Sequence, residues 1–227
     1  MRQVSCPAVL YNLLVKKFME KVSSKEWWPV ECGLDWPAPK DATFERIVGA
    51  VLVQNATWHN NASRAIQNLK NLGILEPLRL FKSDFEMLKD AIRPAGCMGR
   101  KLKVLREIAQ LVTMMNMNRM DIHSLRQVLL NVDGIGPETS DVILLYACNR
   151  PVIPISTPAM RILERFCGLE AKDYVGWQTY VENNLPKDVR TYRTFHALLV
   201  EFGLNFCTKI RPKCEVCIIK EYCNYRS

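Results

Sequence analysis

The sequence has no uninterrupted apolar run that approaches the roughly 18 residues of a membrane-spanning helix. Residues 1–21 contain an apolar stretch, but charged side chains interrupt it and no small-residue cleavage site follows. We therefore predict an amphipathic helix here and not a signal peptide. An intracellular protein, in the cytoplasm or nucleoid and without a membrane partner, is expected.

The sequence also has almost no alternation of apolar and polar residues, which is the pattern of a half-buried β-strand. Apolar residues recur at helical spacing over residues 62–72, and residues 44–53 form a nearly continuous apolar segment typical of a buried helix. Further helices are predicted over residues 85–92, 101–115, 122–130, 139–148, 160–166, 177–183 and 192–202. Loops are expected around residues 29–40 and 149–158. The sequence therefore predicts an all-α protein.

Acidic residues are outnumbered by basic ones, because 31 Lys and Arg face 23 Asp and Glu, which gives a formal charge of +8. A basic excess favours nucleic acids or other anionic surfaces as partners. The hydrophobic content of 48% and the charged content of 24% are those of an ordinary globular protein. At 227 residues the chain has room for one large domain or two small ones.

Cysteine is abundant for an intracellular chain, with nine residues in two groups. Five are scattered and are expected to be small buried hydrophobic residues: Cys6, Cys32, Cys97, Cys148 and Cys167. The other four follow one another near the C-terminus with the spacing C-x6-C-x2-C-x5-C: Cys207, Cys214, Cys217 and Cys223. Four thiols so close in sequence can converge on one centre.

Three kinds of centre compete for this C-terminal group. Disulfide pairing is disfavoured in a reducing compartment. A zinc ion with four thiolate ligands is chemically possible, but zinc sites usually combine two C-x2–4-C pairs. One close pair flanked by single cysteines suits a [4Fe–4S] cluster better.

A glycine turn lies between two predicted helices, over residues 129–139. Gly134 and Gly136 permit positive φ angles and a close approach of backbone, and Pro137 suits the first position of a helix. The backbone amides around Ile135 and Gly136 are then expected to face outward at a helix N-terminus, where they bind one phosphate oxygen. Such a contact reads the nucleic-acid backbone and not its sequence. By itself, a Gly-x-Gly turn also fits a plain connection between two helices.

The glycine turn, the helix after it and the cysteine loop together resemble the endonuclease III-type DNA glycosylases of the helix-hairpin-helix superfamily. The resemblance covers about residues 41–223. It implies two helical lobes: a helical barrel over residues 35–150 that ends in the helix-hairpin-helix, and a second lobe of residues 1–34 and 151–227. It also implies a [4Fe–4S] cluster on the four cysteines of the loop 207–223, and a monomer that binds double-stranded DNA.

The resemblance assigns DNA contacts to several residues. In the hairpin these are Gly134, Ile135, Gly136 and Thr139, and in the cysteine loop Lys209, Arg211 and Lys213. Gln54 matches a family glutamine that fills the gap left by an extruded base. Residues 92–101 resemble a second DNA-facing loop, in which Met98 is the candidate wedge and Lys101 a further contact. Extrusion is required because the sugar–base bond is inaccessible within the duplex.

Two catalytic positions of the family are changed in this sequence. Bifunctional members carry a lysine nucleophile where this chain has Glu138, and a carboxylate cannot form the imine needed for strand cleavage. AP-lyase activity is therefore not expected. Active members carry an aspartate at the position of Ser156. A neutral hydroxyl gives little support to the positive charge that develops as a glycosidic bond breaks.

The sequence thus favours a monofunctional N-glycosylase of base-excision repair that acts on a damaged or mismatched base. Glu138, or Asp141 one turn further along, would replace the missing acid. Two alternatives stay open: a lesion-binding protein that excises nothing, and an enzyme that modifies a flipped base without cleaving the glycosidic bond. An engineered substitution at position 156 would also explain why serine stands where active members carry aspartate.

Overall fold

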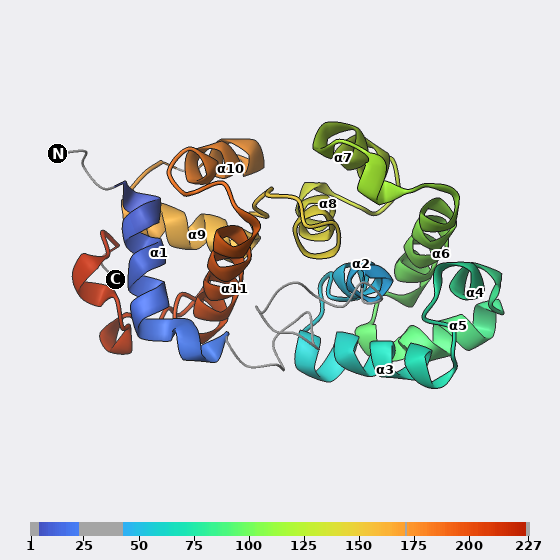
Figure 1. Ribbon diagram of the computed structural model, residues 1–227. Coiled ribbons are helices and arrows are strands. Elements are labelled where there is room, and N and C mark those ends of the chain that lie inside the picture. The colour runs from blue at the N-terminus through green and yellow to red at the C-terminus, as the bar shows by residue number, and fades with distance from the viewer. Residues whose placement is uncertain (1–4, 23–42, 171, 226–227) are drawn as a thin grey trace. The chain divides into compact units, whose positions relative to one another are not determined.

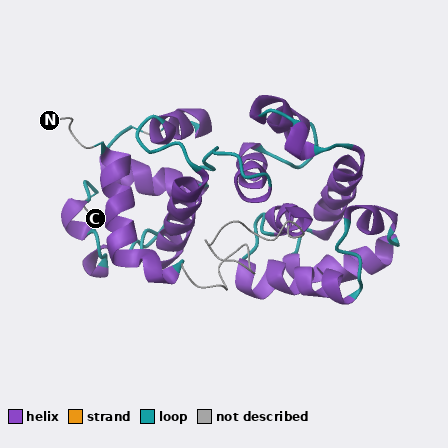
Figure 2. Cartoon of the chain, in the orientation of Figure 1, coloured by secondary structure: helices purple, strands orange, loops and turns teal. Residues whose placement is uncertain are grey.

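The computed structural model describes residues 5–22, 43–170 and 172–225 of the chain (Figure 1). Every regular element within these ranges is a helix or helical turn, which confirms the predicted all-α class (Figure 2). None of the described helices is long and apolar enough to cross a membrane. The chain divides into two compact units, one of Met1–Ser24 with Pro151–Ser227 and one of Lys25–Arg150. The expected domain boundary after residue 34 lies outside the described residues.

Residues 25–150 form what we call the hairpin unit. Its α-helices are α2 (Thr43–Leu52), α3 (Ser63–Asn71), α4 (Pro77–Lys82), α5 (Phe85–Ile92), α6 (Met98–Met114), α7 (Ile122–Leu130) and α8 (Pro137–Val142). Helix α2 contacts α3, α6 and α8, so it lies at the centre of the unit (Figure 1). Its apolar residues pack into the core, and Ile47, Val48 and Val51 are fully buried. Burial on all sides explains why this segment lacks a polar face.

Residues 1–24 and 151–227 form the second unit, which we call the cysteine unit. Its α-helices are α1 (Cys6–Phe18), α9 (Thr157–Cys167), α10 (Tyr174–Glu182) and α11 (Val189–Asn205), and the cysteine loop follows α11. Helices α1, α9 and α11 contact one another pairwise. Edge-on ring contacts join Phe18 to Phe202 and to Phe206, each with centroids 5.7 Å apart. These aromatic contacts bring α1 against the end of α11 beneath the loop.

Polar N-cap residues explain where several helices begin. The side chains of Asp173 and Asp188 accept hydrogen bonds from backbone amides at the starts of α10 and α11. Both helices begin three residues before the ranges predicted from apolar spacing, because the aspartate N-cap and not the apolar spacing sets where each helix starts. Helix α4 was not predicted at all, since only Leu80 of its six residues is buried.

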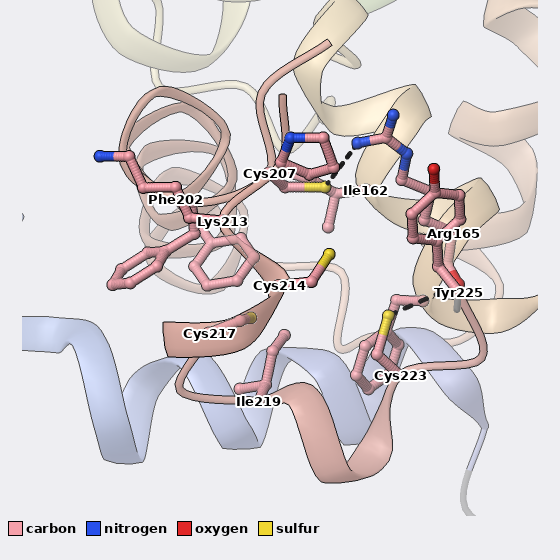
Figure 3. A pocket seen from close by; sticks show the side chains of 13 residues that line it. Ile162, Arg165, Phe202, Cys207, Lys213, Cys214, Cys217, Ile219, Cys223 and Tyr225 are labelled. Atoms are coloured by element: carbon pink, nitrogen blue, oxygen red, sulfur yellow. Dashed lines mark hydrogen bonds between the residues drawn. The ribbon is translucent and has the colours of Figure 1, made fainter. Parts of the chain in front are cut away.

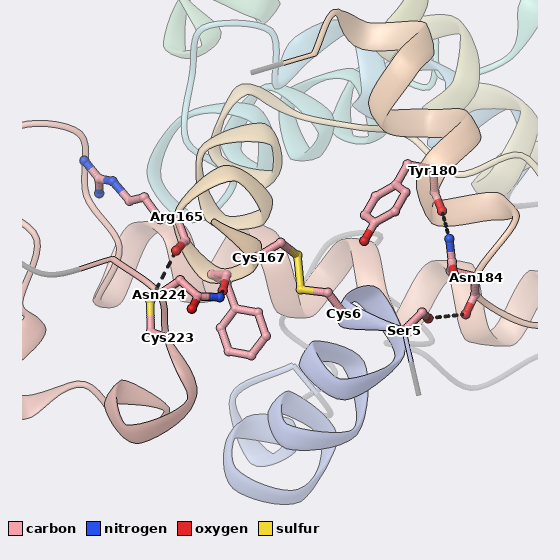
Figure 4. The surroundings of a disulfide bond; sticks show 9 residues. Ser5, Cys6, Arg165, Cys167, Tyr180, Asn184, Cys223 and Asn224 are labelled. Carbon is pink, nitrogen blue, oxygen red and sulfur yellow. Dashed lines mark hydrogen bonds between the residues drawn. A yellow bond between two sulfur atoms is a disulfide. The ribbon is translucent and has the colours of Figure 1, made fainter. Parts of the chain in front are cut away.

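The scattered cysteines differ from the expectation of small buried residues. Cys6 and Cys167 form a disulfide, which joins the first residue of α1 to the last residue of α9 (Figure 4). Cys97 is an exposed free thiol, and Cys148 is buried as expected. Cys32 lies outside the described residues. The expectation is therefore wrong for three of the four scattered cysteines that the structure describes.

Candidate functional site

A backbone hydrogen bond within the glycine turn closes the turn between α7 and α8. Gly134 has a φ of +97°, and a Cβ atom there would lie 2.7 Å from Cγ2 of Val104 on α6. Any other residue would displace the Val104 side chain and would be strained at this φ, so glycine is strongly favoured. The amide of Ile135 donates to the carbonyl of Val132 at 3.0 Å, and the Ile135 side chain is buried. The expectation that the Ile135 amide faces outward is therefore wrong.

The other backbone amides of the turn, at the start of α8, are placed where they could bind an anion. Gly136 is the N-cap and Pro137 the first helical residue, as predicted. Helix geometry leaves the amides of Gly136, Glu138 and Thr139 without an acceptor in the preceding turn. Partial positive charge accumulates at such a helix start, which favours a negatively charged group.

Gln54 lies across this turn. Its Nε2 atom donates to the carbonyl of Gly134 at 3.1 Å and to Oγ1 of Thr139 at 2.9 Å. Gln54 follows the end of α2, so these bonds join the loop after α2 to both sides of the hairpin. The structure thus brings Gln54 together with two hairpin residues, Gly134 and Thr139, and all three were expected to contact DNA.

Lys101 does not reach the surface, contrary to its expected role in DNA contact. The side chain is 1% exposed, and its ammonium donates to the carbonyls of Leu52 at 2.8 Å and Ala95 at 2.6 Å. Burial lowers the pKa of this lysine, and the nearby Cys97 thiol acts in the opposite direction. Lys101 therefore ties α6 to the end of α2. Met98, the candidate wedge, is the half-buried first residue of α6.

Asp141 is also engaged inside the hairpin unit. Its side chain is fully buried, and its two oxygens accept hydrogen bonds from Nε and Nη2 of Arg126 on α7, at 2.6 Å and 3.1 Å. A carboxylate held by a guanidinium in this two-point geometry is neutralised and fixed. Asp141 joins α7 to α8, so the expectation that it serves as a catalytic acid is not supported.

Glu138 is the remaining acid of the hairpin helix that the sequence singled out. It lies in the first turn of α8, and its side chain is exposed. Desolvation nevertheless raises the pKa of its carboxyl to about 7. At neutral pH both protonation states are populated, as a general acid or base requires.

Ser156 is the N-cap of α9 in the cysteine unit. Its Oγ accepts a hydrogen bond from the amide of Ala159 at 3.2 Å, and the residue is 4% exposed. Side chains of α10 hold the segment before it: Glu182 accepts from the amide of Ile153, and Gln178 donates to the carbonyl of Ile153. The serine hydroxyl thus has a defined structural role at the position of the family aspartate.

The four cysteines of the loop line one pocket, together with apolar side chains from α9 and α11 (Figure 3). All four are free thiols. Burial raises the pKa of Cys217, and the negative charges of the other three loop thiols raise it further. The pKa of Cys223 is raised in the same way, by burial first and then by the charges of Cys207 and Cys214. The four sulfur atoms therefore lie close enough to influence one another.

This set of donors fits a metal centre made of thiolates alone. Four thiolates in an apolar pocket suit a [4Fe–4S] cluster or a zinc ion. Within the described residues, however, no three His, Cys, Asp or Glu side chains are gathered as a group that could hold a metal ion. Three basic residues of the loop are exposed: Lys209, Arg211 and Lys213.

Two functional contacts were not predicted from the sequence. Arg126 neutralises Asp141 from another helix, and Arg165 donates to the sulfur of Cys207 at 3.4 Å. Both arginines lie on amphipathic helices, where an exposed basic residue is the ordinary expectation. Their partners lie 15 and 42 positions away in sequence, and no local pattern links them.

Comparison with known proteins gives relatives along most of the chain, although no family model matches it. A protein of Methanocaldococcus jannaschii, provisionally named a DNA repair glycosylase, is 34% identical over 218 residues, which are 92% of this chain and 94% of that protein. An endonuclease III of Sulfolobus acidocaldarius is 30% identical over 186 residues, 80% of this chain and 82% of its own. The 3-methyladenine DNA glycosylase MagIII of H. pylori, solved with 1,N6-ethenoadenine, shares the fold with a TM-score of 0.73 at 24% identity, covering 89% of this chain and 98% of its own. The hairpin and cysteine loop thus occur in a chain that belongs to the endonuclease III-like family of DNA glycosylases.

Proposed function

We propose that this protein binds double-stranded DNA, extrudes a damaged or mismatched base and hydrolyses its N-glycosidic bond without cleaving the strand. The observation that carries the proposal is Glu138, an accessible carboxyl with a pKa of about 7 in the first turn of the hairpin helix. A general acid or base works best when its pKa lies near the working pH. The names of the relatives support a glycosylase.

In the proposed reaction the hairpin binds one phosphate of the DNA backbone through the amides at the start of α8. The carboxylate of Glu138 then accepts a proton from water, whose oxygen forms the new bond to C1′ of the sugar. The bond between C1′ and the base breaks, and its electron pair leaves with the base, which takes up a proton. Glu138 cannot form an imine with the sugar, so no covalent intermediate forms and the strand is not cleaved.

We further propose that Cys207, Cys214, Cys217 and Cys223 hold a [4Fe–4S] cluster. Such a cluster supplies four iron–sulfur bonds that cross-link the loop, and its chemistry is otherwise electron transfer. The chain's own part is to present Lys209, Arg211 and Lys213 to DNA phosphates. All three are exposed and lie within the loop or beside its ligands.

A glycosylase assay on duplexes that each contain one alkylated, deaminated or mismatched base tests the proposed reaction. We expect release of the free base from at least one duplex, and strand breaks only after alkali treatment. Borohydride added during the reaction should trap no covalent complex. Strand cleavage without alkali, or a trapped complex, would contradict the monofunctional mechanism.

A lesion-binding protein that excises nothing is the second candidate. The observation that favours it is that Ser156 and Asp141 are both occupied, one as a helix cap and one by Arg126. If Glu138 is not sufficient as the only remaining acid, the protein would protect lesion-containing DNA in footprinting and release no base. Footprinting and base release on the same duplexes separate the two candidates.

Replacing Cys217 by serine tests the cluster. The purified protein should be brown with broad visible absorbance, and Cys217→Ser should lose both, because serine is not a soft thiolate ligand for iron. Cys97→Ser is the matched control, since Cys97 is a free and exposed thiol in the other unit. A colourless protein that contains one zinc ion per chain would show a zinc site instead.

The hydrogen bonds of Gln54 predict coupled effects on DNA binding. Thr139→Val removes the hydrogen bond between the two side chains, which is worth about 1 kcal/mol, so it should weaken binding to undamaged duplex roughly fivefold. Gln54→Ala removes this bond and the one to the carbonyl of Gly134, so it should weaken binding at least as much. The two residues act through each other, so the double variant should be no weaker than the weaker single variant. Fluorescence anisotropy with a labelled duplex gives the three Kd values.

Gln67→Ala serves as the control for this cycle. Gln67 is an exposed glutamine on α3, and its observed hydrogen bond is to Asn71, one turn further along the helix. Its Kd should match that of the natural protein. If the effects of the Gln54 and Thr139 substitutions simply add, the two side chains contact DNA independently and the hairpin does not depend on their hydrogen bond.

A further inference from the structure

The end of α9 supports both ends of the cysteine loop. We call Arg165, Phe166 and Cys167 the α9 end turn. The disulfide between Cys167 and Cys6 fixes this turn to the start of α1 (Figure 4). Arg165 and Phe166, which come directly before Cys167, make the contacts of this turn with the loop.

The beginning of the loop is bound by the side chain of Arg165. Its Nη1 atom donates to the carbonyl of Thr208 at 2.8 Å and to the sulfur of Cys207 at 3.4 Å. Its Nη2 atom donates to the carbonyl of Lys209 at 3.2 Å. One guanidinium therefore fixes three consecutive residues, and the first of them is a proposed cluster ligand.

The end of the loop is bound by the backbone of the same turn. The carbonyl of Phe166 accepts from Asn224 twice, from its backbone amide at 3.3 Å and its side-chain amide at 2.9 Å. Gly168 has a φ of +63°, and a Cβ there would lie 3.0 Å from that of Asn224, so the loop end packs closely against this turn.

Helix α1 contacts the second half of the loop. Nζ of Lys17 donates to the carbonyl of Ile218 at 2.9 Å and lies 5.5 Å from the ring centroid of Tyr222. The loop is therefore bound by α9 at its two ends and by α1 in its second half. The disulfide is the covalent link between these two supports.

We propose that the Cys6–Cys167 disulfide is a thiol-sensitive clamp on the cysteine loop. A dithiol reductant gives two electrons and two protons: the S–S bond breaks, Cys6 and Cys167 become thiols, and the dithiol closes to its own disulfide. Both cysteines are only half-buried, so a small reductant reaches them. Reduction frees α1 from the α9 end turn, and the loop then opens more often and loses its cluster faster.

The test uses the full chain and three variants, Cys6→Ser, Cys167→Ser and the control Cys97→Ser. Differential alkylation and mass spectrometry first establish whether Cys6 and Cys167 are paired. Each protein is then measured with and without dithiothreitol for Tm, for the alkylation rate of the four loop cysteines, and for the rate at which visible absorbance fades in the presence of a chelator.

Dithiothreitol should lower the Tm of the natural protein by about 5–10 °C. Alkylation of the loop cysteines and fading should both become faster on the order of tenfold, if opening of the loop limits them. Cys6→Ser and Cys167→Ser should behave like the reduced protein without reductant and should not respond to it. Cys97→Ser should behave like the natural protein.

Two results would overturn the clamp. One is the recovery of Cys6 and Cys167 as free thiols from protein purified without reductant. The other is a lower Tm with unchanged reactivity of the loop cysteines, which would make the disulfide a general staple. The fading measurement rests on the proposed cluster, whereas the alkylation rates do not. Loss of glycosylase activity enters neither readout, so failure of the clamp is distinguishable from failure of the proposed function.

Discussion

Ser156→Asp should raise the rate of base excision on the order of 100-fold. A single charged or dipolar group placed against the transition state typically changes the rate by that factor or more. The natural hydroxyl is neutral and already accepts a hydrogen bond from the amide of Ala159. An aspartate at this position adds the negative charge that supports an oxocarbenium-like state. Single-turnover excision on the most responsive lesion duplex measures the change.

The structure indicates that this variant will fold. Ser156 caps α9 with φ −68° and ψ 158°, and aspartate is as good an N-cap as serine in this conformation. A negative charge at the start of α9 is also favoured by the helix dipole. The opposing cost is desolvation, because the position is only 4% exposed. The amide of Ala159 reduces this cost by donating a hydrogen bond to the new carboxylate.

Ser156→Asn is the matched control, since asparagine has nearly the shape of aspartate and caps helices equally well but carries no charge. It should leave excision at the natural rate. An equal gain in both variants would attribute the effect to shape, and no gain in either would show that position 156 does not meet the sugar. Either result would contradict the role assigned to this position.

The helices were predictable because their residues are placed by local rules. Apolar spacing identified α2, α3 and α5 to within two residues at each end. Apolar spacing misses the first turn of α11, whose start is set by the N-cap Asp188. Helix α4 was missed because its six residues are too few to show a period.

Side chains that act across long sequence distances were not predictable in this way. Gly134 and Gly136 identify the glycine turn in the sequence. Nothing in the sequence places Gln54 on that turn, 80 positions away. The family resemblance assigned Lys101 to DNA contact, and lysine is in general rarely buried. Only the three-dimensional arrangement shows that the carbonyls of Leu52 and Ala95 surround its ammonium.

The disulfide illustrates the same limit. Cys6 and Cys167 are separated by 161 positions, and a pairing at that distance cannot be read from spacing. The expectation of a reducing compartment also argued against any disulfide. By contrast, the four cysteines of the loop lie within one short segment, where their spacing alone pointed to a common centre.

Glu138→Gln should lower excision by about 100-fold or more, which is the usual contribution of a general acid or base. Glutamine keeps the size and hydrogen-bonding ability of the side chain but cannot accept a proton from water. Asp133→Asn is the control, because Asp133 belongs to the same hairpin but is exposed and paired with Lys103. It should leave the rate unchanged.

The pH dependence gives the sharper form of this prediction. Desolvation raises the pKa of Glu138 from 4.5 to about 7, so the carboxylate that acts as the base is lost as the pH falls below 7. The excision rate of the natural protein should therefore rise with pH, bend near pH 7 and then level off, and Glu138→Gln should show no bend there. A bend near pH 7 that persists in Glu138→Gln would assign the titrating group elsewhere and leave Glu138 without a part in the reaction.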